Sequence, residues 1–283
     1  MMKISEFCDS GDEIIEDAIF SSVGHLYGKN ENRLVPIHTS CELNRALVSE
    51  KIAGLIIPDT IPVPSNTGKG IVLSSNPVKT GLMIQKRIIK NSDIQTLPAR
   101  IHQSANIHPT AFVSEHNVSI GKKVQIHENV IIHAGSVIDD YCIIGPNTVI
   151  GLTPYQVECD PTKDCQPLGS VEVKPDVVIH ANCCIERPWF QDTTIIGRRC
   201  QIDNRVTIRQ GAVIDDFSLI TANSEIGEYA AIGKDCWIGL RSSIHPGVHI
   251  GDSCYVTLGS RVTREIGRGM VVKDNWAIKR ERF

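Results

Sequence analysis

The sequence lacks an excess of charge of either sign: its 283 residues carry a formal net charge of −3, with a pI of about 6.4. Strong positive charge is the usual mark of proteins that bind nucleic acid or acidic membranes, so the composition supports neither function. Residues 1–15 contain no apolar run of signal-peptide length. No stretch approaches the ~20 apolar residues of a membrane-spanning helix. We therefore expect a cytoplasmic protein with no nucleic-acid partner and no membrane span.

What the sequence does contain is a repeat of six residues. A branched aliphatic residue stands at every sixth position from Ile196 to Val262, twelve times without a slip. A period of six fits neither an amphipathic helix nor a series of simple hairpins. It predicts a chain that coils into a triangular prism, with 18 residues per coil and each aliphatic side chain pointing inward. The fold class is therefore a mostly β protein, a triangular parallel β-helix of hexapeptide repeats.

The same period starts earlier, at Ile101, slips by one residue after Val113 and resumes at Ile120. Two segments interrupt it, residues 152–170 and residues 186–193. Long loops on a rigid scaffold commonly carry function, so both segments are of interest.

The residue four places after each aliphatic is small or β-branched, as expected where three sides converge and the lumen narrows. Positions 18 apart should stack, so one column is expected to contain Cys200, Ser218, Cys236 and Cys254. Because half of the ten cysteines fall on such inward positions, we expect small buried thiols in a reducing compartment and no disulfide framework. Cys159 and Cys165 flank an acidic loop, but a metal site needs more ligands at tighter spacing. We predict no metal.

Residues 1–95 do not show the period and are expected to form a small α/β domain, followed by the β-helix over 96–266 and a basic tail over 267–283 that caps the open end. Within the first domain, a capping box at Thr39 and Glu42 predicts a short helix. Residues 52–58 and 70–75 are expected to form buried strands. The pair Asn76-Pro77 predicts the start of a helix that runs to about residue 91.

Taken together, these features resemble the UDP-3-O-acylglucosamine N-acyltransferases, hexapeptide-repeat enzymes of the lipid A pathway. The N-terminal domain matches through IAGLIIP and the helix at Asn76-Pro77, and the prism matches through the loop after Ile150 and through DTTIIGRRCQIDNRVTI, residues 192–208. The resemblance implies a left-handed prism and a homotrimer with active sites between neighbouring prisms. It implies transfer of an acyl group to the amine of a nucleotide-linked amino sugar, with no bound cofactor. The thioester donor would be acyl-CoA or acyl carrier protein.

The sequence departs from the family at several functional positions. Gln210 stands where the family has its catalytic histidine, and glutamine can orient a substrate but cannot accept a proton near neutral pH. Gly247 stands where the family has a second histidine. The uracil-stacking aromatic and its asparagine are replaced by Ile37 and Ser40. The helices that dock acyl carrier protein in the family have no counterpart in residues 267–283, which favours acyl-CoA as the donor.

His245 is the best candidate for the missing general base, because histidine titrates near neutral pH and this residue lies nearest the family's site. Counting by 18 places it two coils above Arg209, with Gly227 between them. Arg209 could pair with a phosphate or make a solvated or intersubunit contact. Asp203 and Asn204 match the family pattern and could bind substrate, or they could only hydrogen-bond within their turn.

Trp189 and Phe190 lie in the second interruption, where they could contact a sugar or a pantetheine arm, or pack against a neighbouring subunit. Six histidines directly follow an inward aliphatic, and for most of them decoration of a prism corner is the simpler interpretation. These six are His102, His108, His127, His133, His180 and His245.

Three functions remain open from the sequence. The first is an N-acyltransferase. The second is a non-catalytic trimeric binding or scaffold protein that has lost the base. The third is a zinc hydratase of the carbonic anhydrase type, which needs three converging histidines. His127 and His133 lie on different corners of the expected prism, which disfavours the third function.

Overall fold

The computed structural model describes residues 2–8, 12–64, 66–91, 96–155, 167–274 and 276–279. The chain divides into two compact units. The first unit comprises residues 1–95, 155–168 and 189–192, and the second comprises residues 96–154, 169–188 and 193–283. Among the described residues, no helix has the length and apolar character that a membrane span requires.

The first unit is built on a five-stranded sheet with the order β2-β7-β6-β5-β4 in its described residues. Strands β4 to β7 are parallel to their neighbours, and β2 lies antiparallel at the edge. The strands are β2 (Glu13–Glu16), β4 (Ser22–Val23), β5 (Arg33–Pro36), β6 (Ile52–Pro58) and β7 (Gly70–Ser74). Strands β1 (Met2–Lys3) and β3 (Ile19–Phe20) form an antiparallel pair, and a 3-10 turn, η1 (Ile4–Glu6), follows β1.

Two helices complete this unit, α1 (Ser40–Leu47) and α2 (Pro77–Asn91). The predicted capping box is present, because the Thr39 hydroxyl accepts from the Glu42 N–H at 3.2 Å and the Glu42 carboxylate accepts from the Thr39 N–H at 3.1 Å. The predicted strands and helices at 52–58, 70–75 and 77–91 are also present. The strands before residue 40 were not predicted, because most are too short to show a pattern.

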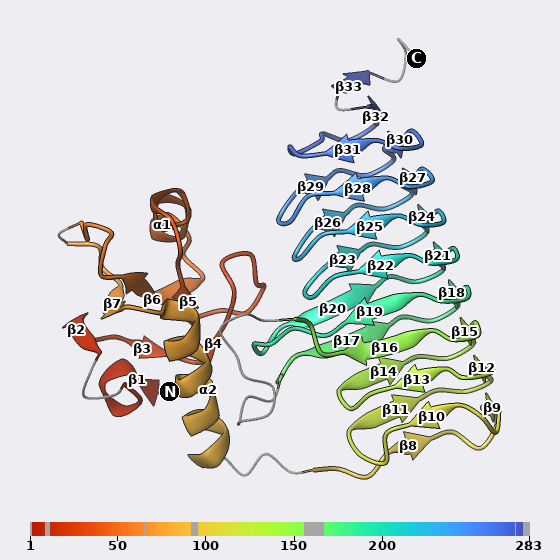
Figure 1. Ribbon diagram of the computed structural model, residues 1–283, viewed down its shortest axis with the longest axis horizontal. Coiled ribbons are helices and arrows are strands. Elements are labelled where there is room, and N and C mark those ends of the chain that lie inside the picture. Colours follow the sequence, from red (N-terminus) through yellow and green to blue (C-terminus); the bar gives the residue numbers. More distant parts are fainter. Residues whose placement is uncertain are drawn as a thin grey trace. The chain divides into compact units, whose positions relative to one another are not determined.

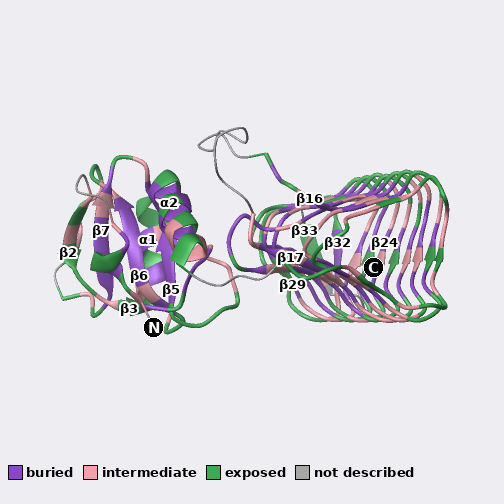
Figure 2. Cartoon of the chain, turned by 90° about the horizontal axis from the view of Figure 1, so that it is seen from below, coloured by how far each residue is buried: buried purple, intermediate pink, exposed green. Residues whose placement is uncertain are grey.

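Side chains of the central strands alternate between two hydrophobic clusters, as the pleat of a strand requires. One cluster gathers Leu34, Ile56 and Val72 with residues of α2, and the other gathers residues of the same strands with Leu43 and Ala46 of α1. Figure 2 shows β5 and β6 coloured as buried over most of their length.

The second unit is a prism with three walls of parallel strands stacked coil upon coil (Figure 1). The described strands of the first wall are β8 (Arg100–Ile101), β11 (Val118–Ile120), β14 (Ser136–Ile138), β17 (Ser170–Val173), β20 (Thr193–Ile196), β23 (Val213–Ile214), β26 (Ala231–Ile232) and β29 (His249–Ile250). Those of the second wall are β9 (Asn106–Ile107), β12 (Gln125–Ile126), β15 (Ile143–Ile144), β18 (Val178–Ile179), β21 (Gln201–Ile202), β24 (Leu219–Ile220), β27 (Trp237–Ile238), β30 (Tyr255–Val256), β32 (Met270–Lys273) and β33 (Trp276–Lys279). Those of the third wall are β10 (Phe112–Val113), β13 (Ile131–Ile132), β16 (Val149–Leu152), β19 (Cys184–Glu186), β22 (Thr207–Ile208), β25 (Glu225–Ile226), β28 (Ser243–Ile244) and β31 (Arg261–Val262).

The register confirms the predicted fold class. Ile208, Ile226 and Ile244 pair in sequence along the third wall, each 18 residues after the last. Across the predicted slip the spacing is 19, since Ile101 pairs with Ile120. The residue that directly follows an inward aliphatic of the third wall is called a third-corner residue below. The residue that directly follows an inward aliphatic of the second wall is called a second-corner residue.

The inward aliphatics are fully or almost fully buried from Ile120 upward. Each such burial contributes about 1.5–3 kcal/mol. Ile101, in the first coil, is 45% exposed because that coil lies at the end of the stack. The predicted column of Cys200, Ser218, Cys236 and Cys254 is buried as well, and burial raises the pKa of Cys200 to about 12. The described cysteines are free thiols.

The tail continues the second wall. Strand β32 pairs in parallel with β30, and β33 turns back antiparallel to β32. Val272 of β32 joins the hydrophobic core of the prism. Lys279 is the last residue of β33, and Arg280, Arg282, Cys159 and Cys165 lie outside the described residues.

Candidate functional site

A groove of about 220 Å³ runs over the third corner of the upper coils, beside strands β25, β28 and β31. Two of the residues singled out from the sequence, Arg209 and His245, line this groove. The full lining is Arg209, Glu225, Gly227, Glu228, Ser243, Ile244, His245, Pro246, Arg261, Val262 and Thr263.

Arg209 is held by two carboxylates. Its Nη1 lies 3.2 Å from Oε1 of Glu186, and its Nη2 lies 3.3 Å from Oε1 of Glu228. Glu186 is only 4% exposed, and burial raises the pKa of its carboxyl although Arg209 lowers it. A buried carboxylate that lost this partner would be left uncompensated, so the pair holds Arg209 at the floor of the groove.

Gln210 does not line the groove. Its side chain is buried, at 7% exposed, and its backbone N–H donates to Oε2 of Glu186 at 3.2 Å. The side chain of Gln210 therefore packs inside the protein, and a role in orienting a substrate stays a prediction.

His245 is exposed on the groove, and its Nδ1 lies 3.2 Å from the Pro246 carbonyl oxygen. The predicted stacking of Arg209, Gly227 and His245 is confirmed, because Arg209 N–H donates to Ile226 O and Gly227 N–H to Ile244 O. A Cβ on Gly227 would lie 2.5 Å from Ile244 O, so glycine is required there. Gly227 itself lines the groove between Arg209 and His245 in the stack of coils.

Asp203 and Asn204 lie at a different corner, the second. Oδ1 of Asp203 accepts from the Asn204 N–H at 2.7 Å, and Oδ2 accepts from the Ala222 N–H at 3.2 Å. Oδ1 of Asn204 accepts from the Ala181 N–H at 3.1 Å. Both side chains therefore brace their own turn and tie it to the coils on either side, while a role in binding substrate stays a prediction.

Asp203 also borders a second groove of about 220 Å³. Its wall is formed by Trp237 and Tyr255, whose rings stack with centroids 6.0 Å apart and an interplanar angle of 19°. The exposed side chains of Leu240 and Leu258 complete an apolar lining. The sequence did not predict this groove.

Trp189 and Phe190 do not face solvent. They are 4% and 7% exposed and belong to the α2-side hydrophobic cluster of the first unit. Nε2 of Gln85 donates to the Trp189 carbonyl oxygen at 2.8 Å and fixes the segment there. The aromatic rings complete a core within the chain, and contact with a ligand or with a neighbouring subunit stays a prediction.

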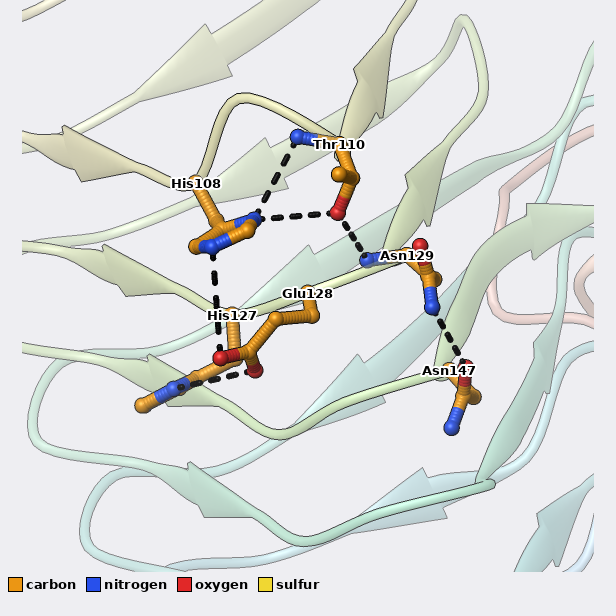
Figure 3. A network of polar contacts seen from close by, with 6 residues as sticks. All are labelled: His108, Thr110, His127, Glu128, Asn129 and Asn147. Atoms are coloured by element: carbon orange, nitrogen blue, oxygen red, sulfur yellow. Dashed lines mark hydrogen bonds and ion pairs between the residues drawn. The ribbon is translucent and has the colours of Figure 1, made fainter.

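The histidines that the structure brings together are His108 and His127, one coil apart at the second corner (Figure 3). Nε2 of His108 and Nδ1 of His127 lie 4.0 and 3.9 Å from the carboxylate of Glu128. The Thr110 hydroxyl lies 2.9 Å from Nδ1 of His108 and accepts from the Asn129 N–H at 3.0 Å. In the part of the chain that the structure describes, no three His, Cys, Asp or Glu side chains are placed to hold a metal ion. The network braces neighbouring coils and gives no support to a zinc hydratase.

Sequence reasoning missed Glu186 and Glu228. Both residues could have been located from the coil register, that is, from which residues of neighbouring coils pair. Glu186 directly follows Ile185, which pairs with Ile208, so it lies beside Arg209 at the third corner. Glu228 stands 18 residues after Gln210, one full coil above it.

Comparisons with known proteins agree with this architecture. Residues 117–152 match the family described as bacterial transferase hexapeptide (six repeats), and residues 229–264 match the hexapeptide repeat of succinyl-transferase. The chain carries the bacterial transferase hexapeptide repeat. A solved UDP-N-acetylglucosamine acyltransferase from Campylobacter jejuni superposes with a TM-score of 0.53 at 19% identity, over 63% of this chain and 71% of that one. That likeness shows the fold.

Curated relatives confirm the resemblance predicted from the sequence. The UDP-3-O-acylglucosamine N-acyltransferase of Bordetella pertussis is 30% identical over 149 residues, which cover 50% of this chain and 41% of the relative. The enzyme of the same name from Wolinella succinogenes is 29% identical over 150 residues, 53% of this chain and 44% of the relative. The matched region thus spans less than half the length of these relatives.

Proposed function

We propose that this protein is an acyltransferase that moves an acyl group from a thioester to the amine of an amino sugar. The observation that carries the proposal is the third-corner groove, where His245, Arg209 and Glu228 meet on a hexapeptide prism. The names of the relatives support the same class of reaction.

The reaction needs one proton acceptor. The amine nitrogen attacks the thioester carbonyl carbon, the C–N bond forms, and the C–S bond then breaks to release the thiol. An acceptor that is bound as an ammonium ion first releases one proton to water. The amine nitrogen loses a second proton as the C–N bond forms, and His245 accepts this proton and passes it to the departing sulfur. A neutral imidazole suits this step near pH 7. Arg209 acts indirectly, since its two ion pairs hold Glu228 at the groove.

The decisive experiment is a thioester-cleavage assay, in which a thiol-reactive dye follows release of the thiol with a panel of amino sugars. We expect amine-dependent release with at least one sugar and no release with its N-acetylated form. Absence of release with every amine and both donor classes would refute the enzyme and favour a trimeric binding or scaffold protein, the alternative that the replacement of the family histidine by Gln210 supports.

For the donor we propose acyl-CoA over acyl carrier protein, because the sequence of the tail carries Lys279, Arg280 and Arg282, whose positive charges suit the phosphates of coenzyme A. Calorimetric titration of the protein with both donors tests this choice. Tight binding of the carrier protein together with no binding of acyl-CoA would reverse it.

We further propose that the protein works in the cytoplasm as a homotrimer, with the third corner of one prism facing a neighbouring prism. In such an assembly the second groove, with Asp203 and the Trp237–Tyr255 stack, would supply an apolar surface for the acyl chain or pantetheine arm. Light scattering should then give a mass of three chains of 31.1 kDa each. A monomeric mass at micromolar concentration would contradict the trimer.

A further inference from the structure

The charged side chains of the third-corner groove differ in how far existing ion pairs occupy them. Arg209 already pairs with Glu186 and Glu228, at 3.2 and 3.3 Å. Glu186 is 4% exposed, so an incoming phosphate would have to take Arg209 from a buried carboxylate. Stranding a buried charge is costly, and Arg209 is therefore a poor receptor for an anionic ligand.

Two of the carboxylates, those of Glu228 and Glu225, are by contrast open to a ligand. Oε1 of Glu228 accepts from Arg209, and the described residues place no hydrogen-bond donor on its Oε2. The Glu228 side chain is 31% exposed and lines the groove. Glu225 is exposed on β25 and lines the same groove. Arg261 is the second cation of the lining, so together with Glu186 behind Arg209 the site has three carboxylates and two guanidinium groups.

The groove is also small. Its volume of about 220 Å³ lies below the roughly 300–1,000 Å³ of pockets that enclose drug-sized ligands. It suits one head group or one sugar ring, and a whole nucleotide-linked sugar would exceed it.

From these observations we propose that the groove binds the ammonium group of the acceptor between Glu228 and Glu225, so that it recognises a free amino sugar ring with no phosphate inside the groove. This inference rests on the proposed acyl transfer and adds the chemistry of the acceptor. Arg209 acts as a positioning residue, because it fixes one oxygen of Glu228 and turns the other toward the ligand. A carboxylate held in place before binding loses less freedom when the ammonium arrives.

The test compares D-glucosamine with N-acetyl-D-glucosamine, which keeps the ring and removes the positive charge. Binding to the full chain is measured by saturation-transfer NMR at pH 6.5, where the amine is protonated. A hydrogen bond between charged groups predicts that glucosamine binds about 10- to 100-fold tighter than its N-acetylated form. Glucosamine 6-phosphate is expected to bind no tighter than glucosamine.

Glu228→Gln should reduce this preference to less than about threefold, since it keeps the shape of the side chain and removes the charge. Glu172→Gln is the matched control, because Glu172 pairs with Lys174 at 2.7 Å on the first wall, outside the groove. Glu225→Gln, at an exposed position, gives a second variant if Glu228→Gln fails to fold, and it should weaken the preference as well.

Equal binding of the two sugars by the parent would overturn the proposal, and so would a preference that survives in the Glu228→Gln and Glu225→Gln double variant. Tighter binding of the 6-phosphate would overturn it too. A preference for glucosamine without any thioester cleavage would instead count against the proposed reaction and leave the ammonium site standing. Thioester cleavage without a preference for glucosamine would count against the ammonium site and leave the proposed reaction standing.

Discussion

Two sets of positions in the same repeat follow opposite rules. The inward positions of the upper coils are almost invariantly aliphatic or small, and all are buried. The third-corner positions directly after the aliphatics instead vary from coil to coil, with Glu186, Arg209, Gly227 and His245 in succession. The inward set determines the fold and admits a polar group only when it is small and hydrogen-bonded, as Ser218 is to the Gly233 carbonyl oxygen, while the corner set carries the groove and its charges.

This difference follows from the surroundings of each position. An inward side chain contacts only other coils, so a change there alters the packing of the whole stack. A corner side chain lies outside the aliphatic core of the prism, and its backbone is already paired with neighbouring coils. Most corner residues can therefore change without loss of the fold, Gly227 being an exception because a Cβ there would clash with Ile244 O. Function can be read from the corner residues only one at a time.

The largest effect is expected when a charge is placed at an inward position, which tests the difference between inward and corner positions directly. Ile226 is fully buried in the middle of the uninterrupted run. Ile226→Asp is expected to lower the free energy of unfolding by more than about 4 kcal/mol, because the carboxylate has no partner there. Leu240→Asp is the control, since Leu240 is 49% exposed and should change the stability by less than about 0.5 kcal/mol. Urea denaturation measures both, and a cooperative Ile226→Asp protein as stable as the parent would refute the inward column.

A second change tests whether the interruption at 186–193 serves packing. Trp189→Ala is expected to destabilise the first unit by about 3–5 kcal/mol, because it empties a site in that unit's core. Hydrogen exchange should show faster opening of β5, β6 and α2 with little change in the upper prism coils. Trp276→Ala, at a position 76% exposed on β33, should leave the first unit unchanged. Unaltered exchange in Trp189→Ala would show that its burial contributes little.

A substitution at a corner is expected to change the activity and to leave the stability nearly unchanged. His245→Ala should lower turnover about a hundredfold, the usual range for loss of a general base, and change the unfolding free energy by less than about 0.5 kcal/mol. His180→Ala is the matched control, an exposed histidine at the second corner. The measurement is turnover at saturating substrate, which should fall in His245→Ala and stay at the level of the parent in His180→Ala. Unchanged turnover would remove His245 from the mechanism.

The smallest effect concerns Glu186, a buried carboxylate at a corner. Its pKa is raised in the folded protein by burial, so the folded state binds its proton more tightly than the unfolded state does. The stability contributed by this group should therefore fall as the pH rises from the ordinary glutamate range through the raised pKa. Glu186→Gln cannot titrate, so the stability of the parent minus that of the variant should increase as the pH is lowered from 7 to 5. A difference that stays constant or decreases would contradict the assignment.

Much of the prism could be predicted because its period is strict and the aliphatic side chain alone decides which position points inward. The pairing of Ile208, Ile226 and Ile244 follows by counting, and so does the placement of His245 above Arg209. The capping box at Thr39 could be predicted for a related reason, since its two hydrogen bonds join residues three apart.

The rest depends on contacts between segments far apart in the sequence. Nothing near Trp189 indicates that it packs with α2, because the partner residues lie about a hundred positions earlier. The ion pairs of Arg209 required the register to be carried across an interruption, from Ile185 to Ile208. The burial of Gln210 was missed because the family's pattern placed a functional side chain at that position, while this chain turns it inside.

The interruptions themselves have a further consequence. Ile138 pairs with Val173, and Val173 pairs with Ile196, so the wall continues as though the extra residues were absent. The entropy of closing a loop grows only with the logarithm of its length, so an insertion at such a place costs little once the next strand returns to register. The coil is therefore modular in the evolutionary sense: a single genetic insertion between two strands can add a new surface and leave every older contact of the core in place.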